Sequence, residues 1–380
     1  MPSARIRRLS VTNFRSYHAA QIDVGARLVV LVGPNGAGKT NLIEAISFLA
    51  PGRGLRRATL EDVAFSEGDG SWAVSADVEG ALGLATLGTG IEPPTSEDAV
   101  VARKCRVDRE PVASASAFAD HLRVVWLVPA MDGLFNGPAS ERRRFLDRLT
   151  LAIDPKMSGP RGRYDRAMRQ RNRLFQMREG SPSLFAGLEE QMAEAGVAIA
   201  AARLDAVARL SALIEATHEA CGPGPFPYAV LNLEGTLEQA LMKRPAIEVE
   251  DDYVSLLSET RERDRLAGRA LAGPHLSDLI VFHGPHNAPA GDCSSGEQKA
   301  LLLGLVLAKA RLIRELSGAA PLVLFDEVAA HLDHARRDAL FVEILDLKAQ
   351  AWMTGTDRST FAPMASQAQI LAVKRGTINA

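Results

Sequence analysis

The sequence contains few cysteines, few aromatic residues and no long apolar run. Its three cysteines, Cys105, Cys221 and Cys293, lie far apart with no C-x-x-C pair, which excludes a zinc ribbon and a disulfide framework and suits a reducing compartment. No apolar run approaches the roughly 20 residues that a membrane-spanning helix needs. The N-terminal segment is basic but lacks the apolar stretch of a signal peptide. We therefore expect a cytoplasmic chain without a membrane partner.

A net charge of one dominant sign is also absent. The chain has 44 Lys and Arg against 46 Asp and Glu, a formal net charge of −2. This balance hides a basic block, because the segment from Glu141 to Gly180 holds 12 basic and 5 acidic residues. Such a block is either a surface for a polyanion or a solvated helix face.

The order of apolar patterns predicts an α/β domain that is interrupted by helices. A length of 380 residues with 47% hydrophobic residues suits two or three globular units. Strand patterns occur near both ends, at Ala26–Val32 and Leu322–Phe325, whereas Leu184–Cys221 has the spacing of one long helix with a helix-packing seam. We expect an ATPase domain in two parts, residues 1–130 and 271–380, with a helical arm at 131–270.

A glycine-rich loop follows the first buried strand and precedes a helix. It matches the pattern G-x-x-x-x-G-K-S/T, in which backbone N–H groups surround a phosphate, the lysine reaches the β- and γ-phosphates and the hydroxyl ligates Mg²⁺. The pattern predicts an ATP site with Lys39 as a catalytic residue and Thr40 as a metal ligand. The nucleotide-binding residues expected here are Gly33, Pro34, Asn35, Gly36, Ala37, Gly38, Lys39, Thr40 and Asn41.

A second apolar strand ends in two carboxylates. The segment LVLFDE places Asp326 and Glu327 directly after the strand Leu322–Phe325. Beside a phosphate loop, the first carboxylate can hold Mg²⁺, and the second can polarise the water that attacks the γ-phosphate. We expect Asp326 to be a metal ligand and Glu327 to be catalytic.

The segment SSGEQK lies shortly before this strand, at the start of an apolar helix. The order of phosphate loop, SSGEQ segment, carboxylate strand and a following VAAHLD segment is that of ABC-type ATPases. In that class the signature serine and glycine, here Ser295 and Gly296, bind the γ-phosphate held by a second subunit, so ATP-dependent dimerisation is expected. P-loop kinases and GTPases lack this signature.

Several further motifs, in order along the chain, resemble the RecF family of recombination mediators. The resemblance covers essentially the whole length. It is carried by LSVTNFRSY at Leu9–Tyr17, PGRGLRRATLEDV at Pro51–Val63, VPAMDGLFNGPASERRRFLDRL at Val128–Leu149, the Arg171-Asn172-x-Leu174 helix, GPHLSDL at Gly273–Leu279 and the SSGEQ and WMTGTD segments.

This resemblance implies a head like those of Rad50 and SMC proteins, with a helical second domain that closes around DNA as an ATP-bound homodimer. It implies action with RecO and RecR to load RecA at single-strand gaps, in recombinational repair, replication restart and SOS induction. Hydrolysis would be slow, stimulated by DNA and used for release. Asn13 and Arg15 would lie near the nucleotide.

The chain also departs from that family in two places, and its switch position is open. No glutamine occurs between Gln21 and Gln170, so the Q-loop glutamine is missing. The family segment Gly-Pro-His-Arg-Asp-Asp reads Gly-Pro-His-Leu-Ser-Asp here. The switch position after the last strand is either Gly355 or Thr356.

Arginines of the basic block are the candidates for contact with DNA. Arginine binds phosphate in a bidentate manner, and a row of arginines can follow a duplex backbone. Few aromatic residues occur between them, so backbone contact is favoured over base stacking. The residues singled out are Arg142, Arg143, Arg166, Arg169 and Arg173.

Two other classes of protein share parts of this pattern. Another SMC-like or OLD-type ATPase would be expected to carry long coiled coils or an additional nuclease domain, and neither is evident. A transporter ATPase would be more compact than the roughly 255 residues that separate Lys39 from Ser294. The RecF-type clamp is therefore the preferred interpretation, with an SMC-like or OLD-type ATPase as the alternative.

Overall fold

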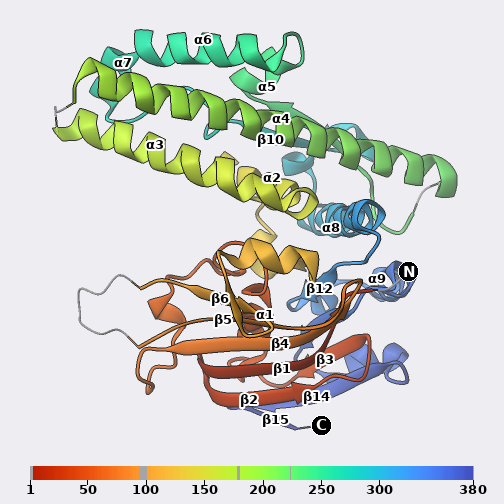
Figure 1. Ribbon diagram of the computed structural model, residues 1–380. Coiled ribbons are helices and arrows are strands. Elements are labelled where there is room, and N and C mark those ends of the chain that lie inside the picture. Colours follow the sequence, from red (N-terminus) through yellow and green to blue (C-terminus); the bar gives the residue numbers. More distant parts are fainter. Residues whose placement is uncertain (1–2, 94–100, 178–179, 223, 380) are drawn as a thin grey trace. The chain divides into compact units, whose positions relative to one another are not determined.

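The computed structural model describes residues 3–93, 101–177, 180–222 and 224–379 (Figure 1). The chain forms two compact units. The first comprises Met1–Asp132, Pro223–Phe226 and Leu302–Ala380, and the second comprises Gly133–Gly222 and Pro227–Leu301. We call them the sheet unit and the helical unit and describe each by itself.

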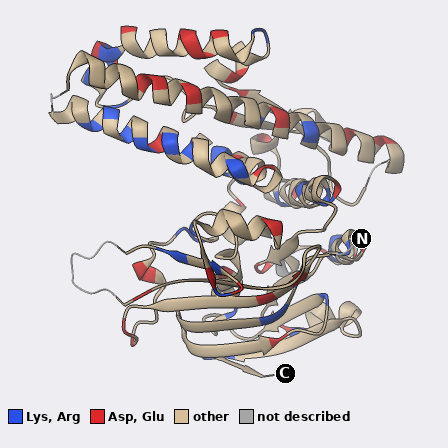
Figure 2. Cartoon of the chain, in the orientation of Figure 1, with Lys and Arg blue, Asp and Glu red and all other residues tan. Residues whose placement is uncertain are grey.

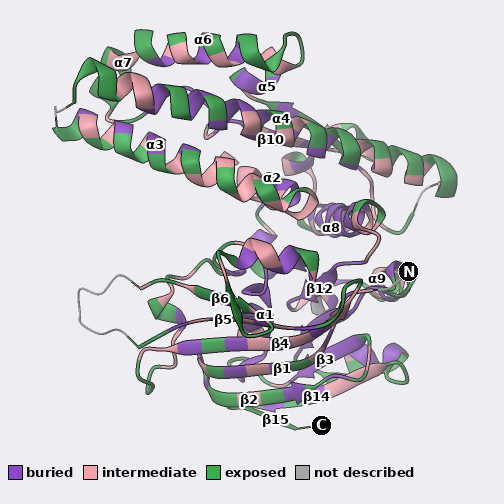
Figure 3. Ribbon diagram, in the orientation of Figure 1, coloured by how far each residue is buried: buried purple, intermediate pink, exposed green. Residues whose placement is uncertain are grey.

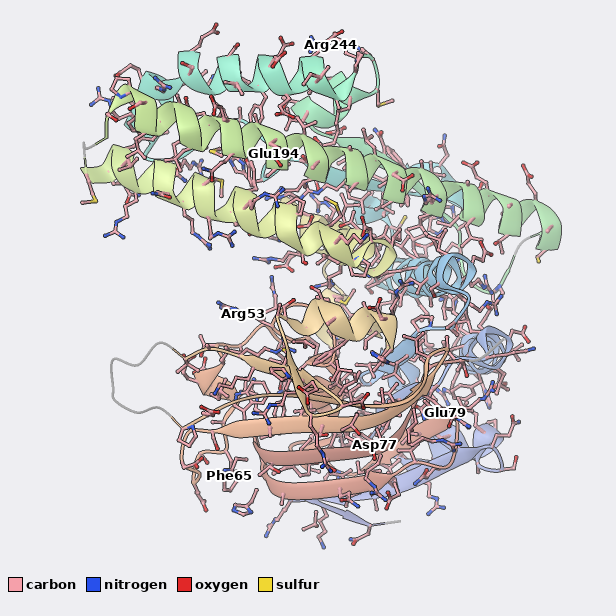
Figure 4. All side chains as sticks on the ribbon, viewed as in Figure 1. Arg53, Phe65, Asp77, Glu79, Glu194 and Arg244 are labelled. Atoms are coloured by element: carbon pink, nitrogen blue, oxygen red, sulfur yellow. The ribbon has the colours of Figure 1, made fainter. Side chains whose placement is uncertain are left out.

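The sheet unit contains an antiparallel sheet built almost entirely from the first third of the chain. Its strand order is β2-β1-β4-β5-β6-β7. Alternating residues of the long strands are buried, as expected for a sheet with one covered face. Glu79 of β4, labelled in Figure 4, accepts hydrogen bonds from Arg5 of β1. The strands are β1 (Arg5–Phe14), β2 (Tyr17–Asp23), β4 (Trp72–Gly80), β5 (Gly83–Ile91), β6 (Lys104–Val107) and β7 (Glu110–Val112).

The second sheet of this unit joins strands from both ends of the chain, in the order β15-β14-β3-β13-β12-β8. All pairs are parallel except that of β14 with β15. The four apolar strands β3, β13, β12 and β8 are buried, as parallel strands usually are. The strands are β3 (Leu28–Val32), β8 (Val124–Leu127), β12 (Leu322–Phe325), β13 (Ala351–Gly355), β14 (Ala368–Lys374) and β15 (Thr377–Asn379).

Helices connect these parallel strands. Helix α1 (Lys39–Ser47) follows β3 through the glycine-rich loop, and α9 (His334–Leu347) lies between β12 and β13 in the chain. Because β3, β13 and β12 are neighbours and parallel, their carboxyl ends meet at one edge. The residues that follow β3 and β12 are therefore brought together, which is where ligands bind in open α/β sheets.

The helical unit is built on three long helices, α2 (Ala139–Ile153), α3 (Ser158–Met177) and α4 (Pro182–Cys221). Buried and exposed segments alternate along α4 (Figure 3), in agreement with the seam expected from its sequence. Arg163 of α3 pairs with Glu194 of α4, which is labelled in Figure 4. The unit also contains three shorter helices that the sequence patterns did not indicate: α5 (Thr236–Leu241), α6 (Ala246–Glu259) and α7 (Arg261–Ala267). Helices α5 and α6 contribute buried residues to its core.

A small sheet and the start of α8 (Ser295–Ser317) also belong to the helical unit. Strand β10 (Asp278–His283) pairs with β9 (Ala229–Glu234) and β11 (Ala288–Pro289). Since β9 follows α4 in the chain, this pairing groups residues 271–301 with the helices rather than with the second sheet. Within the described residues, no helix is both long and apolar enough to cross a lipid bilayer.

Candidate functional site

The glycine-rich loop between β3 and α1 has backbone conformations that favour glycine. Gly36 and Gly38 have φ values of 77° and 110°, which side chains on an L-residue disfavour. A Cβ on Gly38 would lie 2.7 Å from Tyr17 Oη, and that hydroxyl donates to Gly38 O at 3.1 Å. The loop therefore requires glycine at this position, and the hydrogen bond from Tyr17 of β2 stabilises the loop.

Lys39 is folded back onto the loop that it ends. Its Nζ donates to Gly33 O at 2.6 Å and to Pro34 O at 2.9 Å. Burial lowers the pKa of this amino group, whereas the charges of Glu327 and Asp326 act in the opposite direction. The cation is thus held at the loop by two backbone carbonyls, within the electrostatic influence of Asp326 and Glu327.

Asp326 lies at the carboxyl end of β12 and accepts hydrogen bonds from two hydroxyl groups. Thr40 Oγ1 donates to its carboxylate oxygens at 2.9 and 3.0 Å, and Thr354 Oγ1 donates to Oδ1 at 2.8 Å. Asp326 is only 6% exposed. Carboxylate and hydroxyl oxygens are ligands that Mg²⁺ prefers, so Thr40 and Asp326 fit the metal-binding role expected from the sequence.

Glu327 leaves the strand with an unusual backbone. Its φ of 55° lies in the left-handed region, and its N–H donates to Thr354 Oγ1 at 2.8 Å. A non-glycine residue in this region costs free energy and is frequent at functional sites. The Thr354 hydroxyl therefore fixes Asp326 and the turn to Glu327 together.

Arg15 and Asn41 belong to a polar cluster on the first turns of α1. The centre of the cluster is Glu44, which is fully buried and is bound by both nitrogens of the Arg15 fork at 3.0 and 2.8 Å. Arg56 donates to Glu44 and to Asn41 Oδ1. The structure thus shows Arg15 bound to α1 and Asn41 bound to neighbouring side chains, Arg56 and Ser16.

Asn13 lies two residues before Arg15, with a φ of 48°. Its Nδ2 donates to Asp69 Oδ1 at 3.3 Å. Its Oδ1 is buried without a hydrogen-bond partner among the described residues. An acceptor of this kind is costly to bury, and the carboxamide could rotate to offer its donor elsewhere.

The SSGEQ segment forms the N-terminus of α8, in the helical unit. The Ser294 N–H donates to Glu297 Oε2 at 2.8 Å, and the Glu297 N–H donates to Ser294 Oγ at 3.4 Å, which is the reciprocal pattern of a capping box. The Ser294 hydroxyl also donates to Glu297 Oε2 at 2.7 Å, and this bond, followed by those of the Ser294 N–H and His286, lowers the pKa of the Glu297 carboxyl to about 2. Ser295 and Gly296 are exposed, and a Cβ on Gly296 would meet no atom within 4 Å.

Gln298 holds the loop that precedes this helix. The side chain is 5% exposed, and its Nε2 donates to the carbonyls of Gly291 and Cys293 at 3.1 and 2.8 Å. Its Oε1 accepts from Asn136 Nδ2 at 3.2 Å. The exposed Ser295 and Gly296 therefore follow a loop that the hydrogen bonds of Gln298 stabilise within the helical unit.

Two of the candidate DNA-binding arginines have contacts inside the helical unit. Arg142 binds Asp278 with both arms of its fork, at 2.8 and 2.7 Å, and donates to three backbone carbonyls. Arg143 donates to the Ser277 carbonyl at 2.8 Å. Arg142 thus joins α2 to β10 and offers little to an external phosphate.

The other three candidates lie on the exposed face of α3. Figure 2 shows Lys and Arg recurring along this helix. Among the described residues, Arg166, Arg169 and Arg173 form no ion pair, and all three are exposed. By contrast Arg171 is fully buried and binds Glu189 and Asp264.

Together, the sheet and its edge define an ABC-type ATPase of the SMC and RecF class. Residues 5–379 match the family model described as RecF/RecN/SMC N terminal domain. A solved structure of the recombination mediator protein RecF with ATP, of the RecFOR pathway, has a TM-score of 0.83 at 19% identity, covering 99% of this chain and 97% of that one. An SMC head domain from Pyrococcus furiosus has a TM-score of 0.52 at 18% identity, covering 100% of this chain and 96% of that one.

The chain belongs to the RecF family. It is 50% identical to the DNA replication and repair protein RecF of Mesorhizobium japonicum over 379 residues, covering 100% of this chain and 98% of the relative. It is also 50% identical to the RecF protein of Brucella abortus over 374 residues, covering 98% of this chain and 95% of the relative. The resemblance stated from the motifs is confirmed, and so is the ATPase-head fold with a helical domain.

The structure brings together Lys39, Thr40, Asp326 and Glu327, whereas Ser295 and Gly296 lie in the other compact unit. Sequence reasoning missed Tyr17, Glu44 and Thr354. Of these, Thr354 had a signal, because it lies in the WMTGTD segment at the end of a predicted strand. The expected switch positions were the next two residues: Gly355, whose carbonyl accepts from Gly33 N–H, and Thr356, which is exposed.

Proposed function

We propose that this chain is an ATP-dependent DNA-binding clamp that assists recombinational repair. The observation that carries this is the cluster of Lys39, Thr40, Asp326, Glu327 and Thr354 at one sheet edge, in a chain of the RecF family. It supports binding of ATP, with the glycine-rich loop and Lys39 on the phosphates. Thr40 and Asp326 would hold Mg²⁺, which supplies charge neutralisation at the phosphates.

Residues of this chain would then perform a slow hydrolysis. Lys39 would exchange its loop carbonyls for phosphate oxygens, and Glu327 would orient and polarise the attacking water. The exposed N-terminus of α8 supports a role in trans, since an exposed Ser295 and an open Gly296 at a helix N-terminus suit a phosphate. Ser295 and Gly296 of the partner subunit would complete each site, so that ATP drives dimerisation.

DNA is the proposed ligand of the dimer. The exposed Arg166, Arg169 and Arg173 on α3 support contact with a phosphate backbone, whereas the bonds of Arg142 favour a structural role for it. We further propose stimulation of hydrolysis by DNA, release on hydrolysis, and action with RecR and RecO at gaps to load RecA, including during the SOS response. Asn13, with its unsatisfied oxygen, would contribute to nucleotide contact, and Arg15 would position α1.

Analytical ultracentrifugation tests this proposal. The Glu327→Gln variant with ATP and Mg²⁺ should sediment as a dimer and should retain a gapped duplex, because nucleotide binding is intact and hydrolysis is blocked. Lys39→Met is the matched control and should remain monomeric with weak DNA binding. A Glu327→Gln protein that stays monomeric with ATP would rule out completion of the site in trans.

A further inference from the structure

A pocket of about 150 Å³ lies wholly within the helical unit, apart from the residues assigned to ATP. Three helices and the Gly273–Ser277 loop surround it. The volume exceeds that of several water molecules, so the pocket can receive a small polar group. Its charged lining residues are Arg143, Arg144, Arg161, Arg203, Asp147 and Asp165.

Most of these charges are already paired with one another. Asp147 Oδ1 forms an ion pair with Arg203 Nη2 at 2.7 Å, and Asp147 Oδ2 forms one with Arg161. Arg144 pairs with Glu141, one turn away on α2. The aspartate is therefore shared between two cations and is not available to a third.

Arg143 differs from its neighbours. Among the described residues, its guanidinium has no carboxylate within ion-pair distance, and its one hydrogen bond goes to the neutral Ser277 carbonyl at 2.8 Å. Burial lowers the pKa of this group first and the positive charge of Arg203 lowers it further, while Asp278 and Asp147 oppose the shift. A guanidinium has five N–H donors, so most of them remain available at the pocket.

The floor of the pocket is neutral. His275 Nε2 lies 3.1 Å from the Ala270 carbonyl, which can only accept, so this nitrogen carries the proton. Nδ1 then accepts from Tyr164 Oη at 2.7 Å, and burial lowers the pKa of the imidazole. A neutral histidine and a tyrosine hydroxyl do not repel an anion, and the two carboxylates of the lining, Asp147 and Asp165, are paired with Arg203 and Arg161.

We propose that this pocket binds a phosphate group, with Arg143 as its principal cation. A planar fork with free donors, a second arginine nearby and the polar side chains of Tyr164 and His275 in the lining are the features that select a phosphate oxyanion over a chloride ion. The phosphate could be carried by a DNA strand or could be free. In the first case the inference rests on the proposed function, because the pocket would then anchor DNA to the helical unit.

The test uses the full chain with saturating ADP and Mg²⁺, which occupies the glycine-rich loop. The ³¹P line width of inorganic phosphate is followed in the wild type, in Arg143→Gln and in Arg209→Gln. Arg209 is an exposed arginine of α4 whose ion pair with Asp205 lies outside the pocket, so its variant is the matched control. We expect broadening in the wild type and the control, and at least about ten-fold weaker binding in Arg143→Gln.

Duplex DNA binding with ATP distinguishes the two sources. A parallel loss of phosphate and DNA affinity in Arg143→Gln supports a DNA phosphate, whereas loss of phosphate binding alone supports a free phosphate. Absence of broadening in the wild type, or equal broadening in Arg143→Gln, overturns the proposal. Arg143→Lys, which keeps the charge but not the fork, guards against misfolding and should show an intermediate affinity.

A wild-type protein that binds no DNA at all would contradict the proposed function. The phosphate titration would still decide whether the pocket binds an anion, because it does not depend on DNA.

Discussion

Thr354 is the residue that links the Asp326 carboxylate to the backbone of Glu327. Its hydroxyl donates to Asp326 and accepts from the Glu327 N–H. Thr354→Val keeps the volume but removes both bonds, and a hydrogen bond to a charged group contributes about 1.5–3 kcal/mol. We expect the steady-state ATPase rate to fall by about ten-fold or more with little change in melting temperature. Thr354→Ser, which retains the hydroxyl, is the control, and a normal rate in the valine variant would show that the link is dispensable.

Arg171 illustrates a buried charge whose role is structural. It is fully buried, binds Glu189 and Asp264 at 3.0 and 2.7 Å, donates to the Leu257 carbonyl and lies over the Phe175 ring at 4.7 Å. Arg171→Leu would leave the buried Asp264 carboxylate without its cation, whereas Glu189 would keep Arg261. Removing one partner of a buried ion pair typically costs about 3–5 kcal/mol.

Urea unfolding checks this expectation through the free energy of unfolding of the helical unit. Arg173→Leu, an exposed neighbour on α3, should change it by less than about 0.5 kcal/mol. Equal values for the two variants would argue against a structural role for Arg171.

Helix α3 presents one face to the protein and another to solvent. Arg166, Arg169 and Arg173 share the exposed face. If each contacts one DNA phosphate, replacing all three with Gln should reduce the slope of log K against log salt by about 0.9 per contact, or about 2.7 in total. Fluorescence anisotropy over a range of salt concentrations measures the slope. An unchanged slope would move the DNA interface to another surface.

The elements that the sequence predicted best are those with a strong local signal. Hydrophobic periodicity and helix-breaking residues correctly predicted the buried strands β3 and β12, the glycine-rich loop and the 40-residue helix α4. The sequence did not indicate helices α5 to α7, because their order depends on packing against distant elements: α5 and α6 pack on α4, and α7 packs on α3. The pairing of β10 with β9 is equally non-local, so nothing near residue 271 could show that this segment belongs with the helices.

The candidate site was predictable where one motif defines it, and not where the fold brings distant side chains together. Lys39, Thr40, Asp326 and Glu327 come from recognisable motifs. Thr354 becomes meaningful only once β13 is seen to lie between β3 and β12. Similarly, the arginine count of the basic block could not separate the buried Arg171 from the exposed residues around it, since that depends on carboxylates far along the chain.

At the scale of the whole molecule, the two compact units should respond differently to nucleotide. ADP with Mg²⁺ at 100 times its Kd stabilises the state that binds it by about 2.7 kcal/mol. We expect hydrogen exchange to slow at β3, α1, β12 and β13 of the sheet unit. The core of α4 should change little. Lys39→Met should remove the protection, and uniform protection of both units would contradict independent responses.

The second sheet also determines the order in which the chain can mature on the ribosome. Strand β3 is synthesised early, yet both of its neighbours, β13 and β14, come from residues 351–374. Until those strands emerge, an apolar strand has two unpaired edges, which is a risk for aggregation. The antiparallel sheet, whose strands all lie before residue 113, can form first. The nascent protein therefore gains its nucleotide site last, and a truncated chain would be a substrate for chaperones and proteases rather than a partly active enzyme.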